Sequence, residues 1–195
     1  MFDARNYAKM RNQVPRDNTR GSPRTRLISS VAMLTVVAGG VWFYSIRKTN
    51  ELLDIGVDDH LHCAMGQAPK AEKAEGLGTQ FAPMLQPVVD AAGADYTVVS
   101  AHRCNVSGRT YFHIILQQLK QSQTPVSVIL TPRDAQEVFP RTLSSRLHEG
   151  TRDGFSVAGF QSGAHLGYII SALPGNENSE LAARLAPVID RYTKP

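Results

Sequence analysis

Thiol and imidazole side chains, which bind soft transition metals, are concentrated in two short segments of the chain. Both cysteines and four of the six histidines fall within residues 60–63 and 102–113. The candidate metal ligands are His60, Cys63, His102, Cys104 and His113. Zinc or copper would suit this set of donors. His62 and His165 are additional candidate ligands.

The alternation of apolar and polar residues predicts a β-hairpin in the second segment. Strands over residues 96–104 and 109–119 would be joined by a turn at 105–108. In that register Cys104 lies opposite Arg109 and His102 opposite Tyr111, which puts four side chains on one face: His102, Cys104, Tyr111 and His113. The other face has a better composition for a core: Val99, Ala101, Phe112, Ile114 and Leu116. We therefore expect the face with His and Cys to be half exposed and functional.

Residues 27–46 form a run of twenty residues without a charge, bounded by Arg26 and Arg47. At about 1.5 Å per residue, a helix of this length would cover the ~30 Å hydrocarbon core of a bilayer. The run predicts a transmembrane helix, with Trp42 and Tyr44 near the headgroups. The alternative is a cleaved signal peptide, because Ala38-Gly39-Gly40 offers a small-residue cleavage site.

The basic residues predict the orientation of this helix. Seven Lys or Arg residues precede the run and only two follow it closely, which favours a cytoplasmic N-terminus. The C-terminal part would lie in the periplasm or outside the cell. Exposed thiols do not persist in such a compartment. Three states of Cys63 and Cys104 remain open: a disulfide, a metal site beside His102 and His113, or two inert buried thiols.

The charge of the chain does not indicate a nucleic-acid partner. Residues 1–48 carry nine basic and two acidic side chains, whereas the rest carries twelve basic and fifteen acidic ones. The overall charge of +4 therefore reflects the predicted membrane topology.

The order of the elements predicts an α+β fold. Helices are expected over residues 79–92 and from Ser179 to about Tyr192, and further strands over 125–131, 155–162 and 166–173. Residues 140–154, with a solvated His148, are expected to be an irregular loop. The prediction is four regions: a disordered basic tail (1–26), the transmembrane helix (27–46), a connector with the His/Cys motif (47–78) and one domain (79–195). That domain would have an antiparallel sheet of about five strands and two main helices.

Several short motifs resemble the outer domain of bacterial membrane-anchored anti-sigma-factor-like proteins. They are Asp59-His60-Leu61-His62-Cys63-Ala64, Ala101-His102-Arg103-Cys104, Arg109-Thr110-Tyr111-Phe112-His113, Gly159-Phe160-Gln161-Ser162-Gly163-Ala164-His165-Leu166 and Ile170-Ser171-Ala172-Leu173-Pro174. The resemblance spans residues 51–190. It implies a location in a bacterial inner membrane. It also implies a sensory or accessory outer domain with His and Cys at matched places: His60, Cys63, His102, Cys104, His113 and His165. In that family a cytoplasmic zinc-binding domain with a His-x-x-x-Cys-x-x-Cys motif precedes the membrane helix. Residues 1–26 contain neither Cys nor His, so we do not expect sigma-factor binding.

Two classes of function follow. The first is a membrane-anchored sensory or ligand-binding module that uses its His/Cys cluster for metal binding or redox sensing. The second is a non-catalytic accessory subunit of a membrane protein complex, in which the cysteines form a structural disulfide. We do not expect an enzyme, because no spacing marks a hydrolase triad and no nucleophile elbow is present.

Overall fold

The computed structural model describes residues 23–65, 72–106, 108–119, 124–140 and 146–194. The chain divides into two compact units, Met1–Trp42 and Phe43–Pro195. In the first unit the described residues belong to helix α1 (Pro23–Asp59), and side chains such as Val36 and Trp42 are exposed. Most of the predicted N-terminal tail, residues 1–22, lies outside the described part.

Helix α1 does not end at Ile46, where the predicted transmembrane helix ended. It continues to Asp59 through a charged segment in which Arg47 Nε lies 3.0 Å from Glu51 Oε1. Residues 49–59, which we expected to be a connector, are therefore helical. Within the described ranges, no helix is long and apolar enough to cross a membrane. The fold prediction with a separate transmembrane helix over residues 27–46 is wrong.

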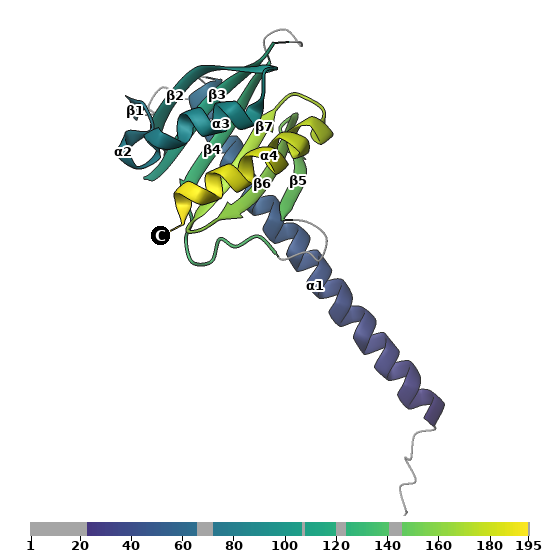
Figure 1. The fold of residues 1–195 in the computed structure, drawn as a ribbon. Helices are drawn as coiled ribbons and strands as arrows, with labels where there is room; N and C mark the ends of the chain where they lie inside the picture. Colours follow the sequence, from purple (N-terminus) through teal and green to yellow (C-terminus); the bar gives the residue numbers. More distant parts are fainter. Residues whose placement is uncertain (1–22, 66–71, 107, 120–123, 141–145, 195) are drawn as a thin grey trace, which may run out of the picture. The chain divides into compact units, whose positions relative to one another are not determined.

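The second unit is built on one antiparallel sheet of seven strands, in the order β1-β2-β3-β4-β7-β6-β5 (Figure 1). The strands are β1 (Glu72–Glu75), β2 (Tyr96–Val106), β3 (Arg109–Gln118), β4 (Pro125–Pro132), β5 (Leu147–Arg152), β6 (Phe155–Ser162) and β7 (His165–Ser171). The prediction of about five strands missed the two edge strands. β1 and β5 lie in segments that we expected to be loops.

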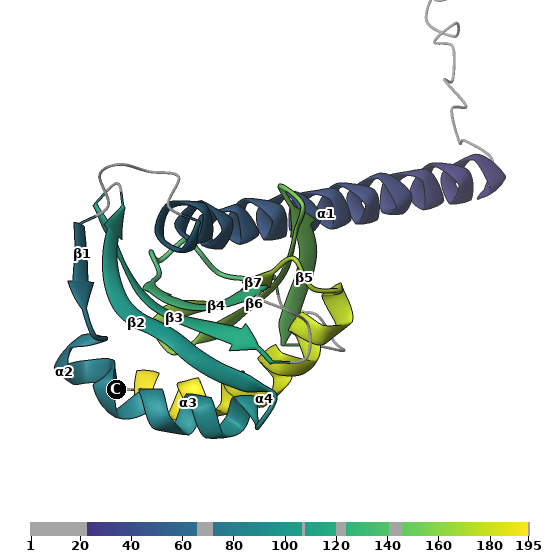
Figure 2. The ribbon, with the colours of Figure 1, turned by 90° about the horizontal axis from the view of Figure 1, so that it is seen from above.

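Helices cover both faces of the sheet (Figure 2). One face packs against α2 (Gly78–Phe81), the 3₁₀ turn η3 (Ala82–Met84), α3 (Leu85–Ala92) and α4 (Gly175–Thr193). This side holds the larger core cluster, with Phe81, Leu116, Ile169 and Leu185 fully buried. α4 begins four residues before Ser179, where we expected this helix to start, and Ser179 Oγ donates a hydrogen bond to the carbonyl oxygen of Gly175.

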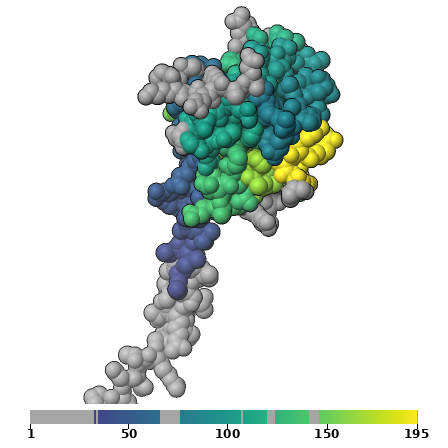
Figure 3. Space-filling view, turned by 90° about the vertical axis from the view of Figure 1, so that its left-hand side faces the viewer, coloured from purple at the N-terminus to yellow at the C-terminus, as the bar shows by residue number. Residues whose placement is uncertain are grey.

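The other face packs against the C-terminal end of α1 and the π-helical turn η2 (His60–Ala64). The blue residues at this end of α1 lie against green residues of the sheet in Figure 3. Leu52 and Leu53 are at most 1% exposed, and Tyr168 Oη donates a hydrogen bond of 2.8 Å to the carbonyl oxygen of Leu52. Glycine allows this approach, because a Cβ on Gly56 would lie 2.6 Å from the Tyr168 ring.

The face of the β2–β3 hairpin that carries His and Cys is consequently buried. His113 is 0% and Cys104 1% exposed, because α1 and η2 cover the face that we expected to be half exposed. Val99, predicted for the core, is 60% exposed and lies at a bulge between Val98 and Ser100. The His/Cys face of the hairpin therefore lies on the side of the smaller core cluster, and not at a solvent-exposed surface.

Candidate metal centre

The β2–β3 hairpin supplies three of the candidate ligands. His102 and Cys104 lie on β2, and their partners across the ladder on β3 are His113 and Tyr111. Because side chains two residues apart point to the same face of a strand, all four project towards α1 and η2. The two imidazole rings are neighbours, with centroids 5.1 Å apart.

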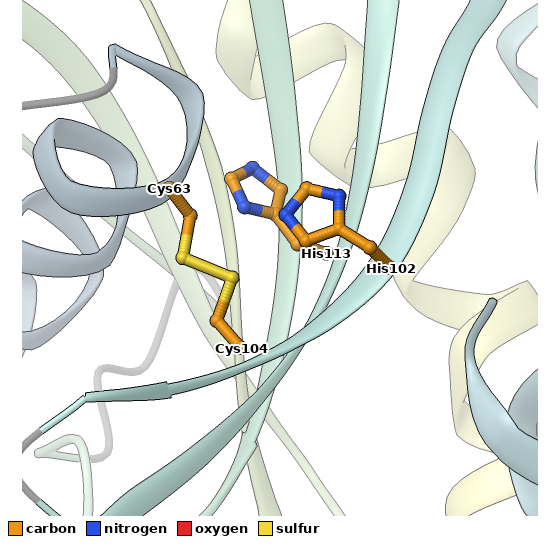
Figure 4. Close-up of side chains that lie close together, drawn as sticks. All are labelled: Cys63, His102, Cys104 and His113. Carbon is orange, nitrogen blue, oxygen red and sulfur yellow. A yellow bond between two sulfur atoms is a disulfide. The ribbon is translucent and has the colours of Figure 1, made fainter. Parts of the chain in front are cut away.

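The fourth candidate comes from the end of α1. The helix widens into the π turn η2, which holds Cys63 at 3% exposure against the hairpin. π turns are rare and are frequent at functional sites. Cys63 and Cys104 form a disulfide with an S–S distance of 2.07 Å, which closes a sequence separation of 41 residues. Figure 4 shows this disulfide beside the rings of His102 and His113.

These four side chains form a buried cluster that could hold a metal ion. The ligand atoms of Cys63, His102, Cys104 and His113 all lie within 4.8 Å of one another. The donor set is two thiols and two imidazoles, which is the Cys₂His₂ set of structural zinc sites. Once the disulfide is reduced, these four side chains therefore suit a zinc ion both in the type of their ligand atoms and in the spacing between them.

Neighbouring polar groups orient both rings. Asp59 Oδ2 lies 3.3 Å from His113 Nδ1, and both side chains are 0% exposed. Ser100 Oγ lies 3.2 Å from His102 Nδ1. Metal-binding histidines commonly have their second nitrogen held in this way, which fixes the ring and the tautomer.

His60 lies beside the cluster and not within it. Its Nδ1 is 2.7 Å from Ser127 Oγ, and its ring meets Phe155 edge-on at 4.6 Å. Burial lowers the pKa of His60 to about 4, so the ring is neutral at neutral pH. The sequence placed His60 among the metal ligands, whereas the structure places it in a contact with β4.

The two additional candidate ligands also lie outside the cluster. His62 is half-buried, and its Nδ1 forms a short contact with the carbonyl oxygen of Asp58. His165 begins β7, and its ring meets Phe81, a residue of the larger core, edge-on at 5.4 Å. Burial lowers the pKa of His165.

Tyr111 shares the face of the cluster but is a poor anionic ligand. Burial raises its pKa to about 12, so the phenol stays protonated at neutral pH.

Sequence reasoning missed the two orienting residues. Ser100 could have been found, because it lies two residues before His102 and so shares its face of the strand. Asp59 could not, because its position depends on α1 continuing through a segment that we expected to be a connector.

No family model, no curated protein and no solved structure matches this chain.

Proposed function

We propose that the unit Phe43–Pro195 is a redox-responsive metal-binding module. In the reduced state Cys63, His102, Cys104 and His113 bind one zinc or copper ion. In the oxidised state the two cysteines form the disulfide and the ion is released. The observation that carries the proposal is that four metal-ligating side chains lie within 4.8 Å, while two of them share a disulfide.

The metal and the disulfide exclude each other because they use the same two sulfur atoms. In a tetrahedral zinc site, Zn–S distances of about 2.3 Å put the sulfurs ~3.7 Å apart. The Cys63–Cys104 bond therefore has to break, and the two sulfurs have to move apart, before both can bind the metal. The other three candidate ligands, His102, Cys104 and His113, lie on one hairpin.

The switching step is a two-electron oxidation. Oxidation by a small-molecule disulfide would take two exchanges. One cysteine thiolate attacks the external disulfide, forms a mixed disulfide with one half of it and releases the other half as a thiolate. The second cysteine thiolate attacks the protein sulfur of that mixed disulfide, so the Cys63–Cys104 bond forms and the remaining half leaves as a thiolate. Two protons are taken up, so the products are two small-molecule thiols and the released metal ion. Such a cycle suits a compartment in which disulfides persist, such as a periplasm or the extracellular space. The membrane location, the membrane-protein partner and the relation to anti-sigma-factor-like proteins stay predictions.

Metal stoichiometry in the two redox states tests the proposal. The full chain, reduced without oxygen and freed of excess metal, should retain about one equivalent of zinc or copper by elemental analysis, and the oxidised chain none. Cys104→Ser should abolish retention, and the matched control His62→Ala should preserve it. A folded, reduced protein that retains no metal would refute the proposal.

A structural disulfide without metal binding is the second candidate. It is favoured by the burial of both sulfurs in the smaller core, where Cys63 is 3% and Cys104 1% exposed. Under this alternative the reduced protein loses stability and gains no metal, so the same measurement separates the two functions.

A further inference from the structure

The carboxylate of Asp59 is a feature of the site that metal binding alone does not require. It is fully buried at the last position of α1, and its Oδ2 lies 3.3 Å from the Nδ1 atom of His113. Ser100 occupies the corresponding position on His102, at 3.2 Å, and carries no charge. The two histidines therefore have neighbours of different chemistry, an ionisable carboxyl group and a neutral hydroxyl group.

An ionised Asp59 would act on a bound metal ion across the His113 ring. If His113 binds the ion through Nε2, the carboxylate would lie ~7 Å from it, by addition of the 3.3 Å contact, the width of the ring and a metal–nitrogen bond of about 2 Å. At such a distance in a buried site, a unit charge changes the binding of a cation substantially.

We propose that Asp59 biases this site towards a divalent ion such as zinc and against cuprous copper; the inference rests on the proposed metal-binding function. Two thiolates and two neutral imidazoles neutralise a divalent ion completely. The same ligands around a monovalent ion leave one negative charge in the core. An ionised Asp59 carboxylate attracts a divalent ion twice as strongly as a monovalent ion at the same distance. It therefore favours the neutral zinc site over the negatively charged copper(I) site.

The alternative role for Asp59 is purely geometric. A carboxylate that only holds the His113 ring in place would strengthen the binding of both ions by a similar factor. Ser100 provides the reference for this case, because it holds the other ring without a charge.

Affinities for zinc and for copper(I), measured by chelator competition on the reduced full chain without oxygen and at one pH, test the inference. Asp59→Asn keeps the shape of the side chain and removes the charge. The ratio of zinc affinity to copper(I) affinity should fall by about 10- to 100-fold, as expected for one charge at ~7 Å with an effective dielectric constant of about 20. Ser100→Ala should weaken the binding of zinc and of copper(I) by similar factors, so the ratio of the two affinities should stay within about threefold of the wild-type ratio.

A parallel loss of both affinities in Asp59→Asn would overturn the inference and leave Asp59 as a positioning residue. If that variant does not fold, Ser100→Asp provides the reverse test at a half-buried strand position. The added carboxylate should raise the same ratio, and an unchanged ratio in the folded variant overturns the inference. Failure of the proposed function looks different, because the reduced wild-type chain would then bind neither ion.

Discussion

At the scale of single residues, His60 links the stability of the fold to pH. Its folded-state pKa of about 4 lies below the ordinary value of 6.5, because burial disfavours the charged ring. The folded state therefore binds fewer protons than the unfolded state between these two values. The contribution of His60 is constant above about pH 6.5, and it destabilises the fold progressively as the pH falls to about 4.

We expect this residue to cost at most about 3 kcal/mol of unfolding free energy over that range. Urea denaturation of the oxidised, metal-free chain at pH 7, 5.5 and 4 measures it. His60→Asn, which keeps a polar atom near Ser127, should show a shallower loss with acid than the wild type. Equal slopes for the two proteins would mean that other groups dominate the acid response.

The sequence could predict which residues of the centre share a face of the hairpin, because side chains alternate between the two faces of a strand. The predicted pairing of His102 with Tyr111 is wrong by two residues, since His102 pairs with His113. A shift of two residues keeps every side chain on its face, so the shared face of His102, Cys104, Tyr111 and His113 was correct. The burial of that face was not predictable, because α1 covers it and the sequence pattern did not extend α1 so far.

At the scale of elements, the edge strand β5 was not predicted, and its polar composition explains why. β5 has no alternation of apolar residues, because its inward positions are filled by His148 and Gly150. The His148 ring stacks on Phe139 at 4.5 Å, and a Cβ on Gly150 would lie 2.7 Å from Leu53. The segment is a strand because α1 and Phe139 pack over it, and those tertiary contacts leave no periodic signal in the sequence.

The packing of α1 on the sheet can be tested at Gly56. Alanine there would place its Cβ 2.6 Å from Tyr168 Cγ and 3.0 Å from Ile170 Cδ1, so the ring or the helix has to move. We expect Gly56→Ala to lower the unfolding free energy of the second unit by about 1–3 kcal/mol, although alanine favours helix by about 1 kcal/mol. Urea denaturation measures the change.

Gly40→Ala is the matched control on the same helix, because nothing lies within 4 Å of the added Cβ among the described residues. It should leave the unfolding of the second unit unchanged. A Gly56→Ala protein as stable as this control would show that α1 does not approach the sheet as closely as described.

At the scale of the whole molecule, the centre joins the end of α1 to the hairpin inside the smaller core. The disulfide closes a separation of 41 residues, for which the chain-entropy relation gives a stabilisation of about 4 kcal/mol. Reduction without metal removes this constraint and leaves the buried thiols held by packing alone. A bound metal restores a cross-link between the same two elements, and stabilises the folded state by about 4 kcal/mol when its free concentration is 1,000 times the dissociation constant.

Three states of the chain should therefore differ in thermal stability in a fixed order. We expect the oxidised chain and the reduced chain with zinc to unfold at similar temperatures, and the reduced, metal-free chain to unfold at a clearly lower one. Differential scanning calorimetry without oxygen measures the three transitions, with Cys63→Ser as the variant that can form neither cross-link. That variant should unfold near the reduced, metal-free wild type and should not respond to zinc. A metal that bridges α1 to the hairpin in the folded state has to raise the free energy of unfolding. If zinc does not stabilise the reduced wild-type chain, the centre is therefore a disulfide and not a metal site.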